Sequence, residues 1–357
     1  MAQYDIIHFE ALGAEAGHLE EETKKALAKG LLPGDLTYLI VPEDLQTCLK
    51  ARPDLVLPDI ITTKTHSVLP EDYLKGKKKS VVTRSAGYDH FEHLAAVINL
   101  ASLREYCVNA VAQTAVKFLY AEAGMLNEYT NNTLTFERNR ATSFVELGKH
   151  LIATVFGCGK IGKRTYELLE GNGLTVQAVD VRREELSTLY GDGVKFVTKE
   201  EAIATSDILV NTMNLTKNPQ SRFYNAGYFS EDYLSAARKK LFFINVTRGE
   251  IAPEAGLLKL YDAGKLLGIG LDVFSREAVF SEGLKENTAF DDPDNIAARE
   301  ILNRAINRSA NFYVQPHQGF NSDLAAIAKA EEAVKHLCAW YGNGKEKFDE
   351  QLPYYEG

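Results

Sequence analysis

The sequence predicts an α/β protein that consists of two doubly wound parallel sheets. Short apolar runs alternate with helix-forming segments along most of the chain, which is the pattern of parallel strands joined by crossover helices. The length of 357 residues is large for a single hydrophobic core and favours two domains. Residues 151–182 combine a buried strand, a glycine-rich turn, a helix and a second strand, the order in which one doubly wound sheet begins.

The first hundred residues carry the elements of one sheet. We expect strands at residues 5–9, 36–41, 60–63 and 80–83, and helices at residues 20–29 and 91–100. Ligands of parallel sheets bind at the carboxyl ends of the strands. The loops at residues 62–67 (TTKTHS) and 84–89 (RSAGYD) are therefore candidate binding segments.

The second sheet follows an alanine-rich helix, predicted at residues 108–127, and the domain crossover is placed near Asn109. Strands are expected at residues 151–156, 174–179, 195–197, 208–210, 241–245, 267–271 and 311–314. The stretch after Phe274 is predicted to be long, irregular and charged. It includes a short helix at residues 296–306, with Asp292 as N-cap and Pro293 in the first turn.

The final helix, predicted at residues 324–341, returns to the first domain, so that this domain is discontinuous in sequence. We expect one domain to comprise residues 1–109 and 316–357, and the other to comprise residues 110–315. The tail at residues 342–357 has no periodicity and receives no assignment.

Gly157, Gly159 and Gly162 follow the strand at residues 151–156 in G-x-G-x-x-G spacing. The first glycine permits the tight turn, the second lets the backbone approach a pyrophosphate, and the third lets helix and strand pack closely. The helix N-terminus then faces the anion. With Asp180 at the end of the next strand, the pattern predicts a Rossmann dinucleotide-binding sheet.

The choice of coenzyme depends on the residues after this second strand. Asp180 can accept hydrogen bonds from the ribose hydroxyls, which favours NAD. Arg182 and Arg183 follow at once and could hold the 2′-phosphate of NADP. We expect NAD, because a phosphate at this position would face the Asp180 carboxylate directly.

Composition excludes several other classes of protein. The net charge is −9, and the only basic cluster is at residues 75–79, so we expect no nucleic-acid ligand. The sequence has no signal-peptide pattern and no apolar stretch of transmembrane length, so no membrane association is expected. The four cysteines lie far apart and resemble reduced thiols rather than a disulfide framework or a zinc site, which favours a cytoplasmic protein. They are Cys48, Cys107, Cys158 and Cys338.

Three ionisable residues, Arg248, Glu277 and His317, come after strands of the second sheet and should face the crevice at its edge. An arginine can hold and polarise a 2-oxo acid, an imidazolium can protonate the forming alkoxide, and a carboxylate can favour the protonated imidazole. A dinucleotide supplies the hydride, so neither a nucleophile nor a metal is needed. Each residue also has a structural interpretation, as a surface ion-pair partner or a structural histidine, which spacing alone leaves open.

From about Asp59 to Ala330 the chain resembles the D-isomer-specific 2-hydroxyacid dehydrogenases. The segment RSAGYDHFE is similar to the substrate loop of that family, VNAVAQTAV to its interdomain helix, and ELGKHLIATVFGCGKIG to the beginning of its NAD-binding fold. NVTRGEI, AGKLLGIGLDVFSRE and QPHQGF are similar to its three catalytic segments. The resemblance implies a Rossmann NAD-binding domain inserted in a flavodoxin-like substrate domain.

The resemblance implies a role for each matched residue. Arg248 would bind and polarise the substrate, His317 would be the acid and base, and Glu277 would be its carboxylate partner. The backbone amides of Ala86 and Gly87 would hold the substrate carboxylate.

The NAD-binding residues are implied in the same way. Lys160 and Ile161 would face the pyrophosphate, residues 212–214 the adenosine side, and the Val246–Thr247 backbone with Asp272 the nicotinamide. The full set is Gly157, Gly159, Lys160, Ile161, Gly162, Asp180, Met213, Asn214, Val246, Thr247, Arg248, Asp272, His317 and Gly319.

The chain departs from the family pattern at three places. Ala278 stands where proline usually follows the catalytic glutamate, and Thr212-Met213-Asn214 stands where histidine, a variable residue and proline are usual. The separation of Glu277 and His317 is longer than expected, so residues 280–310 are interpreted as a lid or an oligomer contact. These departures concern specificity and leave the three catalytic groups in place.

The sequence is therefore interpreted as that of an NAD-dependent D-2-hydroxyacid dehydrogenase that reduces a small to medium 2-oxo acid and forms a homodimer through its NAD domains. PHQGF, with Phe320 near the pocket, is more similar to the D-lactate and D-2-hydroxyisocaproate branch. Two alternatives stay open. Lys64 could meet a phosphate, as in a D-3-phosphoglycerate dehydrogenase, and an NAD(H)-sensing, corepressor-like binding protein could retain all three ionisable residues.

Overall fold

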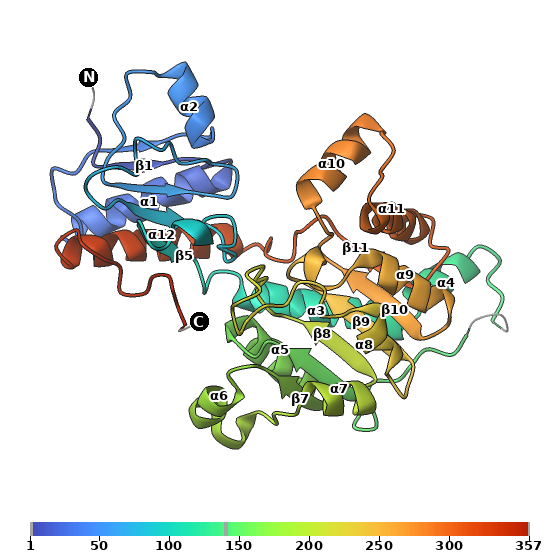
Figure 1. Ribbon diagram of the computed structural model, residues 1–357. Helices are drawn as coiled ribbons and strands as arrows, with labels where there is room; N and C mark the ends of the chain where they lie inside the picture. The colour runs from blue at the N-terminus through green and yellow to red at the C-terminus, as the bar shows by residue number, and fades with distance from the viewer. Residues whose placement is uncertain (1–2, 139–141, 356–357) are drawn as a thin grey trace. The chain divides into compact units, whose positions relative to one another are not determined.

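The computed structural model describes residues 3–138 and 142–355 of the chain. It divides into two compact units, Met1–Cys107 with Asn321–Gly357, and Val108–Phe320 (Figure 1). We call them the split domain and the central domain. All named strand pairs in both sheets are parallel, which confirms the predicted α/β class with two doubly wound sheets.

The second change of unit falls at Phe320, whereas we expected it after residue 315. Residues 316–320 stay with the central domain because backbone N–H groups of this segment donate hydrogen bonds to Asp272 at the end of a central strand. His317 and Phe320 are therefore positioned by the central domain.

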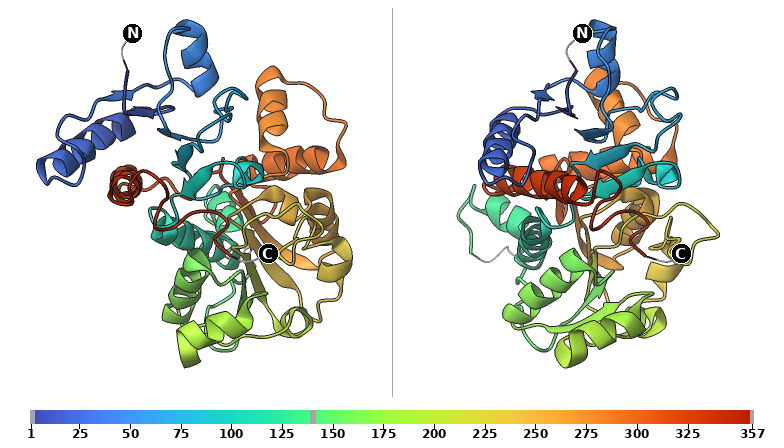
Figure 2. Two further views of the ribbon diagram at one scale, coloured as in Figure 1. Left: turned by 60° about the vertical axis from the view of Figure 1, so that its left-hand side comes forward. Right: turned by 90° about the vertical axis from the view of Figure 1, so that its left-hand side faces the viewer.

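The split domain contains a five-stranded sheet in the order β2-β1-β3-β4-β5, which is the flavodoxin-like order. Its strands are β1 (Ile6–His8), β2 (Tyr38–Ile40), β3 (Ile60–Thr63), β4 (Ser80–Thr83) and β5 (Asn99–Ser102). Helices α1 (Ala14–Ala28) and α12 (Ala325–Gly342) lie side by side against one face of the sheet (Figures 1 and 2). Helix α2 (Leu45–Ala51) packs on the other face, and Asp44 caps it by accepting the Thr47 N–H at 2.8 Å.

The expected helix at residues 91–100 is wrong. Only a 3-10 turn forms at Glu92–Leu94, and Asn99–Ser102 is the edge strand β5, in register with β4. Every residue of β5 is buried. A short apolar run has no periodicity that separates a buried strand from a helix, so the neighbouring strand decided its conformation.

The central domain contains a six-stranded sheet in the order β11-β10-β9-β8-β6-β7. Its strands are β6 (Ile152–Phe156), β7 (Thr175–Val179), β8 (Ile208–Asn211), β9 (Leu241–Asn245), β10 (Leu266–Leu271) and β11 (Phe312–Val314). The strand expected at residues 195–197 is reduced to one bridge, Phe196 to Ala178 of β7. This bridge occupies the third-strand position of the Rossmann order.

The central domain has nine α-helices within the described residues. They are α3 (Val108–Ala123), α4 (Leu126–Asn132), α5 (Lys160–Gly171), α6 (Arg183–Tyr190), α7 (Lys199–Thr205), α8 (Glu231–Ser235), α9 (Glu254–Asp262), α10 (Glu277–Glu286) and α11 (Pro293–Ile306). Helices α3 and α5 pack together on one face, and α9 and α11 pack on the other. The helix expected at residues 108–127 ends earlier, because Met125 adopts a left-handed backbone and starts α4.

We expected the segment after Phe274 to be largely irregular, and this expectation is wrong. The segment forms α10 and α11. Asp292 caps α11 as predicted, accepting the N–H groups of Asp294 and Asn295. The ring of Phe290 lies over Gly283, where a Cβ atom would overlap it, and packs against Phe280. The Arg299 guanidinium stacks on the Phe290 ring at 4.4 Å. These contacts join α10 and α11 into a helical hairpin (Figure 1).

None of the described helices is long and apolar enough to cross a lipid bilayer.

Candidate functional site

The glycine-rich turn after β6 has the geometry that its spacing predicts. Gly157 has a φ of +84°, and an added Cβ atom would lie 2.8 Å from the Cα atom of Met213. A Cβ atom on Gly162 would overlap the carbonyl oxygen of Gly157. In front of Gly159, the N-cap of α5, a Cβ atom would meet nothing within 4 Å. The protein itself requires the first and third glycines, and the second leaves open space at the N-terminus of a helix.

Asp180 lies at the end of β7 and is held by two backbone N–H groups. Its Oδ2 atom accepts from Cys158 at 2.7 Å, and its Oδ1 atom accepts from Arg182 at 2.8 Å. The carboxylate thus joins the glycine-rich turn to the segment after β7. It also lines a hollow of about 570 Å³ together with Val179, Val181, Arg182, Arg183, Glu184, Glu185, Val197, Thr198, Lys199, Arg222 and Tyr228. This hollow has the position and polarity expected of the adenosine side.

Two buried asparagines, neither of them predicted from the sequence, organise the next two strand ends. Asn211 ends β8 and donates from Nδ2 to Asn245 Oδ1 and to Thr247 Oγ1, both at 2.9 Å. Its Oδ1 atom accepts the Met213 N–H at 3.1 Å. Asn245 ends β9 and donates from Nδ2 to the carbonyl oxygen of Arg248 at 2.9 Å. A polar residue that closes a buried strand was the available signal for this pair.

Arg248 follows β9 directly. Its Nη1 atom donates to its neighbour's carbonyl oxygen, that of Thr247, at 2.9 Å. Gly249 comes next and lies so close to the turn after β10 that a Cβ atom would overlap the carbonyl carbon of Phe274. The turn that carries Arg248 is therefore in direct backbone contact with the turn that leads to Glu277.

Asp272, at the end of β10, holds the segment that carries His317. Its Oδ1 atom accepts from Gln315 Nε2 at 2.6 Å and from the Gln318 N–H at 2.8 Å, and its Oδ2 atom accepts the Gly319 N–H at 2.9 Å. Burial raises the pKa of Asp272, and these hydrogen bonds partly offset that effect. A Cβ atom on Gly319 would lie 2.5 Å from Asp272 Oδ2, so this close approach requires glycine.

Glu277 and His317 form the central pair of the site. His317 Nδ1 lies 2.7 Å from Glu277 Oε2, and each side chain is 37% exposed. His317 has a φ of +50°, and its N–H group donates to the carbonyl oxygen of Asp272 at 2.7 Å. The Phe320 ring lies edge-on to the imidazole, with the centroids 6.5 Å apart. The structure therefore brings Arg248, Glu277 and His317 to the carboxyl edge of β9, β10 and β11.

The predicted substrate loop belongs to the split domain and follows β4. The N–H groups of Ala86 and Gly87 donate no hydrogen bond to any other described residue. The residue before the loop, Arg84, is only 1% exposed. The loop thus begins at a buried arginine and presents two backbone donors, the N–H groups of Ala86 and Gly87.

Arg84 uses all of its guanidinium nitrogens inside the split domain. Its Nε atom donates to Glu15 Oε1 at 2.8 Å, Nη1 donates to Thr62 Oγ1, and Nη2 donates to the carbonyl oxygen of Phe9 at 2.6 Å. Glu15 also pairs with Lys64 of the loop after β3. Arg84 therefore ties β4 to β1, β3 and α1 directly beneath the predicted substrate loop.

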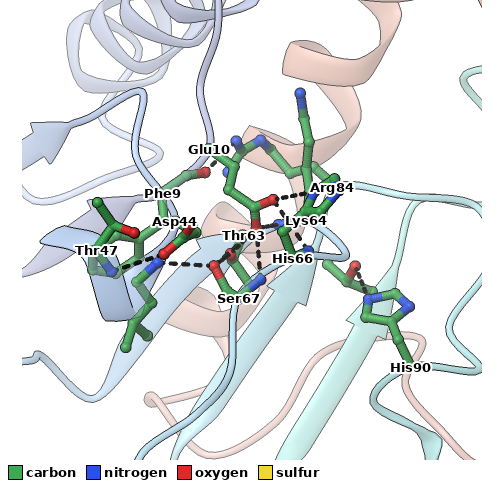
Figure 3. A network of polar contacts seen from close by, with 12 residues as sticks. Phe9, Glu10, Asp44, Thr47, Thr63, Lys64, His66, Ser67, Arg84 and His90 are labelled. Carbon is green, nitrogen blue, oxygen red and sulfur yellow. Dashed lines mark hydrogen bonds and ion pairs between the residues drawn. The ribbon is translucent and has the colours of Figure 1, made fainter. Parts of the chain in front are cut away.

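Glu10, which follows β1, organises the loop after β3 (Figure 3). Its carboxylate accepts from Thr63 Oγ1 and Ser67 Oγ, both at 2.8 Å, and from the Lys64 N–H at 2.9 Å. The His66 N–H also donates to it, at 3.2 Å. Burial opposes ionisation of Glu10, but these hydrogen bonds outweigh it and lower the pKa of the carboxyl group. The TTKTHS loop is thus shaped around a buried carboxylate.

Comparison with known proteins identifies the central domain. The family model described as D-isomer specific 2-hydroxyacid dehydrogenase, NAD binding domain, matches residues 122–319, which is more than half of the chain. The chain belongs to this family. It is an NAD-dependent oxidoreductase that acts on 2-hydroxy acids.

Individual relatives of this dehydrogenase family are distant. D-lactate dehydrogenase of Lactiplantibacillus plantarum is 23% identical over 251 residues, which covers 69% of this chain and 70% of that protein. The solved structure of D-lactate dehydrogenase from Aquifex aeolicus, complexed with NAD and lactic acid, superposes with a TM-score of 0.76 at 22% identity, over 99% of this chain and 100% of that one. The structure of D-2-hydroxyisocaproate dehydrogenase has a TM-score of 0.75 at 20% identity, over 96% and 98% of the two chains. At these identities the two structures show that the fold is shared.

The residues of the central domain fit NAD. The open space in front of Gly159, at the helix N-terminus of α5, suits a pyrophosphate, and the hollow beside Asp180 suits an adenosine. No group of three or more histidines, cysteines or carboxylates within residues 3–138 and 142–355 is placed to hold a metal ion.

Removal of the buried guanidinium should destabilise the split domain. We expect Arg84→Met to lower the free energy of unfolding by about 3–5 kcal/mol, because it leaves the buried Glu15 carboxylate without its main partner. Trp340, the single tryptophan of the chain, is buried in this domain and reports its urea unfolding. The matched control is Arg52→Met, an exposed arginine of the same domain, which should change stability by no more than about 0.5 kcal/mol. Equal effects of the two substitutions would contradict this account.

Coenzyme choice should depend on the charge of Asp180. A 2′-phosphate about 4 Å from this carboxylate costs on the order of 4 kcal/mol at an effective dielectric of 20. The Arg182 side chain is only 9% exposed and already lies 3.9 Å from Asp180 Oδ1, and the exposed Arg183 recovers only ~0–1 kcal/mol. We expect kcat/KM to favour NADH over NADPH by about a hundredfold, or about 2.7 kcal/mol. Asp180→Asn removes the charge and keeps an acceptor oxygen, so it should reduce the ratio to less than about tenfold. Steady-state kinetics with both coenzymes measure the ratio. Equal use of the two by the unmodified protein would refute the role of Asp180.

Proposed function

We propose that this protein reduces a small to medium 2-oxo acid to the D-2-hydroxy acid, reversibly, in a D-lactate dehydrogenase-like reaction. The observation that carries the proposal is the Glu277–His317 pair, with its 2.7 Å contact, at the sheet edge where Arg248 also lies. An acid, its carboxylate partner and a guanidinium are the groups that this reduction needs from a protein.

NAD, when bound, supplies or accepts the hydride. Because His317 Nδ1 is occupied by Glu277, the nitrogen left for the substrate is Nε2. In the reductive direction Nε2–H donates a proton to the oxygen that becomes the alcohol, and in the oxidative direction Nε2 takes it back. Glu277 orients the ring and stabilises the imidazolium, as a carboxylate does for a catalytic histidine. The Arg248 guanidinium binds the substrate carboxylate and polarises the oxo group.

We further propose that the N–H groups of Ala86 and Gly87 bind the substrate carboxylate. Their lack of partners among the described residues supports this role, because exposed backbone donors in a braced loop can accept an anion without reorganisation. Phe320, beside His317, favours a substrate with a small or apolar side chain.

The contacts of Lys64 argue against the D-3-phosphoglycerate alternative. Its ammonium already pairs with Glu15, and Glu10 accepts the N–H group of the same residue. A substrate phosphate placed here would face two buried carboxylates. We therefore propose that the side chain of the 2-oxo acid substrate is uncharged.

A substrate panel tests the proposed reaction against both alternatives. NADH oxidation would be followed with pyruvate, 2-oxoisocaproate, phenylpyruvate, glyoxylate and hydroxypyruvate phosphate. Turnover of one of the first four supports the proposal, and preference for hydroxypyruvate phosphate supports the phosphoglycerate branch. Turnover of none, with NADH bound, supports a corepressor-like binding protein.

Loss of the imidazole should abolish most of the chemistry and leave coenzyme binding intact. We expect His317→Ala to lower kcat by on the order of 10²–10⁴-fold, because the proton donor is lost. NADH fluorescence titration should give a dissociation constant within about threefold of that of the unmodified protein. A loss of less than about fivefold in kcat would rule out His317 as the acid.

We propose that the protein is a homodimer and that the central domain forms its interface. Large apolar side chains are exposed along α3, α4 and the segment after them. Leu134 is 88% exposed and Phe136 is 81% exposed, and Tyr120, Leu126 and Phe144 are also exposed. Exposed apolar side chains this frequent along one stretch of a folded domain favour an interaction surface.

Polar substitution of this surface should weaken the dimer. Burying a large apolar side chain contributes about 1.5–3 kcal/mol, so Leu134→Ser with Phe136→Ser should raise the dimer dissociation constant by at least about tenfold. Analytical ultracentrifugation measures it. Leu189→Ser, at an exposed leucine of α6, is the matched control and should have no effect. A monomeric unmodified protein would contradict the proposal.

We assign the protein to the cytoplasm. The support is that Cys48, Cys107, Cys158 and Cys338 are all free thiols, which suits a reducing compartment. Burial raises the pKa of the Cys158 thiol, in the glycine-rich turn, to about 12 and keeps it unreactive.

A further inference from the structure

A group of buried polar side chains lies behind the turn that carries Glu277. Its members are Glu254, the first residue of α9, Ser275, in the turn after β10, and Asn295, in the first turns of α11. Glu254 is 1% exposed, and the other two are also buried. None of the three was identified from the sequence. They come from three elements that meet below the carboxyl edge of the central sheet.

The backbone of Ser275 is held at both its N–H group and its carbonyl oxygen by this group. Glu254 Oε1 accepts the Ser275 N–H at 2.7 Å, and Asn295 Nδ2 donates to the Ser275 carbonyl oxygen at 2.8 Å. A further bond, from the Ala255 N–H to Asp294 Oδ1 at 3.1 Å, ties α9 to α11. Both backbone polar groups of Ser275 are thus held, one by a residue of α9 and the other by a residue of α11.

Ser275, whose backbone is held in this way, lies two residues before Glu277. Arg276, between them, has a φ of +52° and pairs with Asp292 at 2.9 Å, so the backbone reverses sharply there. The Glu277 side chain contacts the backbone of the same turn, because its Oε1 atom accepts the Phe274 N–H at 3.3 Å. Its Oε2 atom contacts His317. Gly249, next to Arg248, packs against the same Phe274–Ser275 backbone. A shift of Ser275 would therefore move Glu277 relative to both His317 and Arg248.

We propose that Glu254 is a positioning residue for the Glu277–His317 pair: its buried carboxyl group fixes the Ser275 N–H group and thereby the turn that carries Glu277. This inference rests on the proposed function for its kinetic test only.

The remaining atoms of the group are consistent with this role. Glu254 Oε2, Ser275 Oγ and Asn295 Oδ1 are buried without a hydrogen-bond partner, so the group bears a cost in desolvation. Burial raises the pKa of Glu254 to about 7, the hydrogen bond from the Ser275 N–H partly offsets this effect, and the Asp294 carboxylate raises the pKa further. Below pH 7 the residue is therefore largely a neutral acid, which an isosteric amide can replace.

A double-mutant cycle on kcat tests the proposal. Glu254→Ala should lower kcat by about tenfold, with the KM for NADH within about twofold of normal, because the substitution misplaces Glu277 but leaves the coenzyme residues intact. In the Glu277→Gln background the same substitution should cost less than about twofold, because the partner through which it acts has already lost its charge. Equal losses in the two backgrounds would overturn the proposal.

Two further variants separate positioning from general destabilisation. Glu254→Gln keeps an oxygen that can accept the Ser275 N–H and should retain at least about half of kcat, whereas Glu254→Asp, one methylene shorter, should lose as much as Glu254→Ala. The matched control is Glu122→Ala, at another fully buried glutamate of the central domain, which should leave kcat within about twofold. If Glu254→Gln is as impaired as Glu254→Ala, or if Glu254→Asp has full activity, the proposal fails.

A second readout does not depend on turnover. The His317 imidazole nitrogens can be followed by ¹H–¹⁵N NMR, and their signals identified with His317→Ala. Glu254→Ala should move the Nδ1 signal in the same direction as Glu277→Gln does. An unmoved Nδ1 signal in a folded variant overturns the proposal. Failure of the unmodified protein to reduce any 2-oxo acid would instead refute the proposed function and leave this readout valid.

Discussion

The carboxylate of Asp272 is the interaction on which the chemistry-bearing part of the central domain depends. It lies almost fully buried at the end of β10, and three donors from residues 315–319 converge on it. An isolated buried carboxylate would be unfavourable by several kcal/mol. Displacement of residues 315–319 from Asp272 would therefore cost that free energy, because the carboxylate would lose its hydrogen-bond donors. His317 is held in a left-handed backbone conformation by the same segment, since its N–H group donates to the Asp272 carbonyl oxygen. Asp272 therefore fixes the segment around His317 through its carboxylate and the His317 backbone through its carbonyl oxygen.

The neighbouring strand ends follow the same principle. Asn211 and Asn245 are buried amides that close β8 and β9, and their donors and acceptors are used on the turns that carry Met213 and Arg248. Parallel strands end at a common edge, so a polar residue at each end can shape a loop and remain covered by the sheet. The loops at this edge are irregular in conformation but fixed in position. This is the rigidity that a preorganised site needs.

In the split domain, buried charged side chains hold the loops in position. Arg84 and Glu10 are buried, and each organises backbone groups from segments that are distant in sequence. Arg84 lies immediately before the loop with the available Ala86 and Gly87 N–H groups, whereas Glu10 shapes the loop that carries Lys64. A buried charge is costly unless it is fully hydrogen-bonded, and here the partners are supplied by β3, α1 and the segments that follow β1 and β3. The loops of this domain are consequently as well braced as those of the central domain.

The sequence by itself determined the fold class, the glycine-rich turn, Asp180 and the three ionisable residues, because each depends on local spacing that survives any tertiary arrangement. Gly157 is required by its close contact with Met213, after the neighbouring strand, and Gly162 by its close contact with the Gly157 carbonyl oxygen. The G-x-G-x-x-G spacing predicts both requirements from the sequence. The helical and strand character of residues 91–102 and 277–286 was decided only in the tertiary structure, since β5 needs β4 beside it and α10 needs Phe290 over Gly283. The bracing roles of Asn245, Arg84 and Glu254 likewise became recognisable only once folded. Asp272 was expected at the nicotinamide, and only the structure showed its contacts to the segment that carries His317. Their roles depend on partners distant in sequence and on burial, and neither property is carried by any one residue or its neighbours.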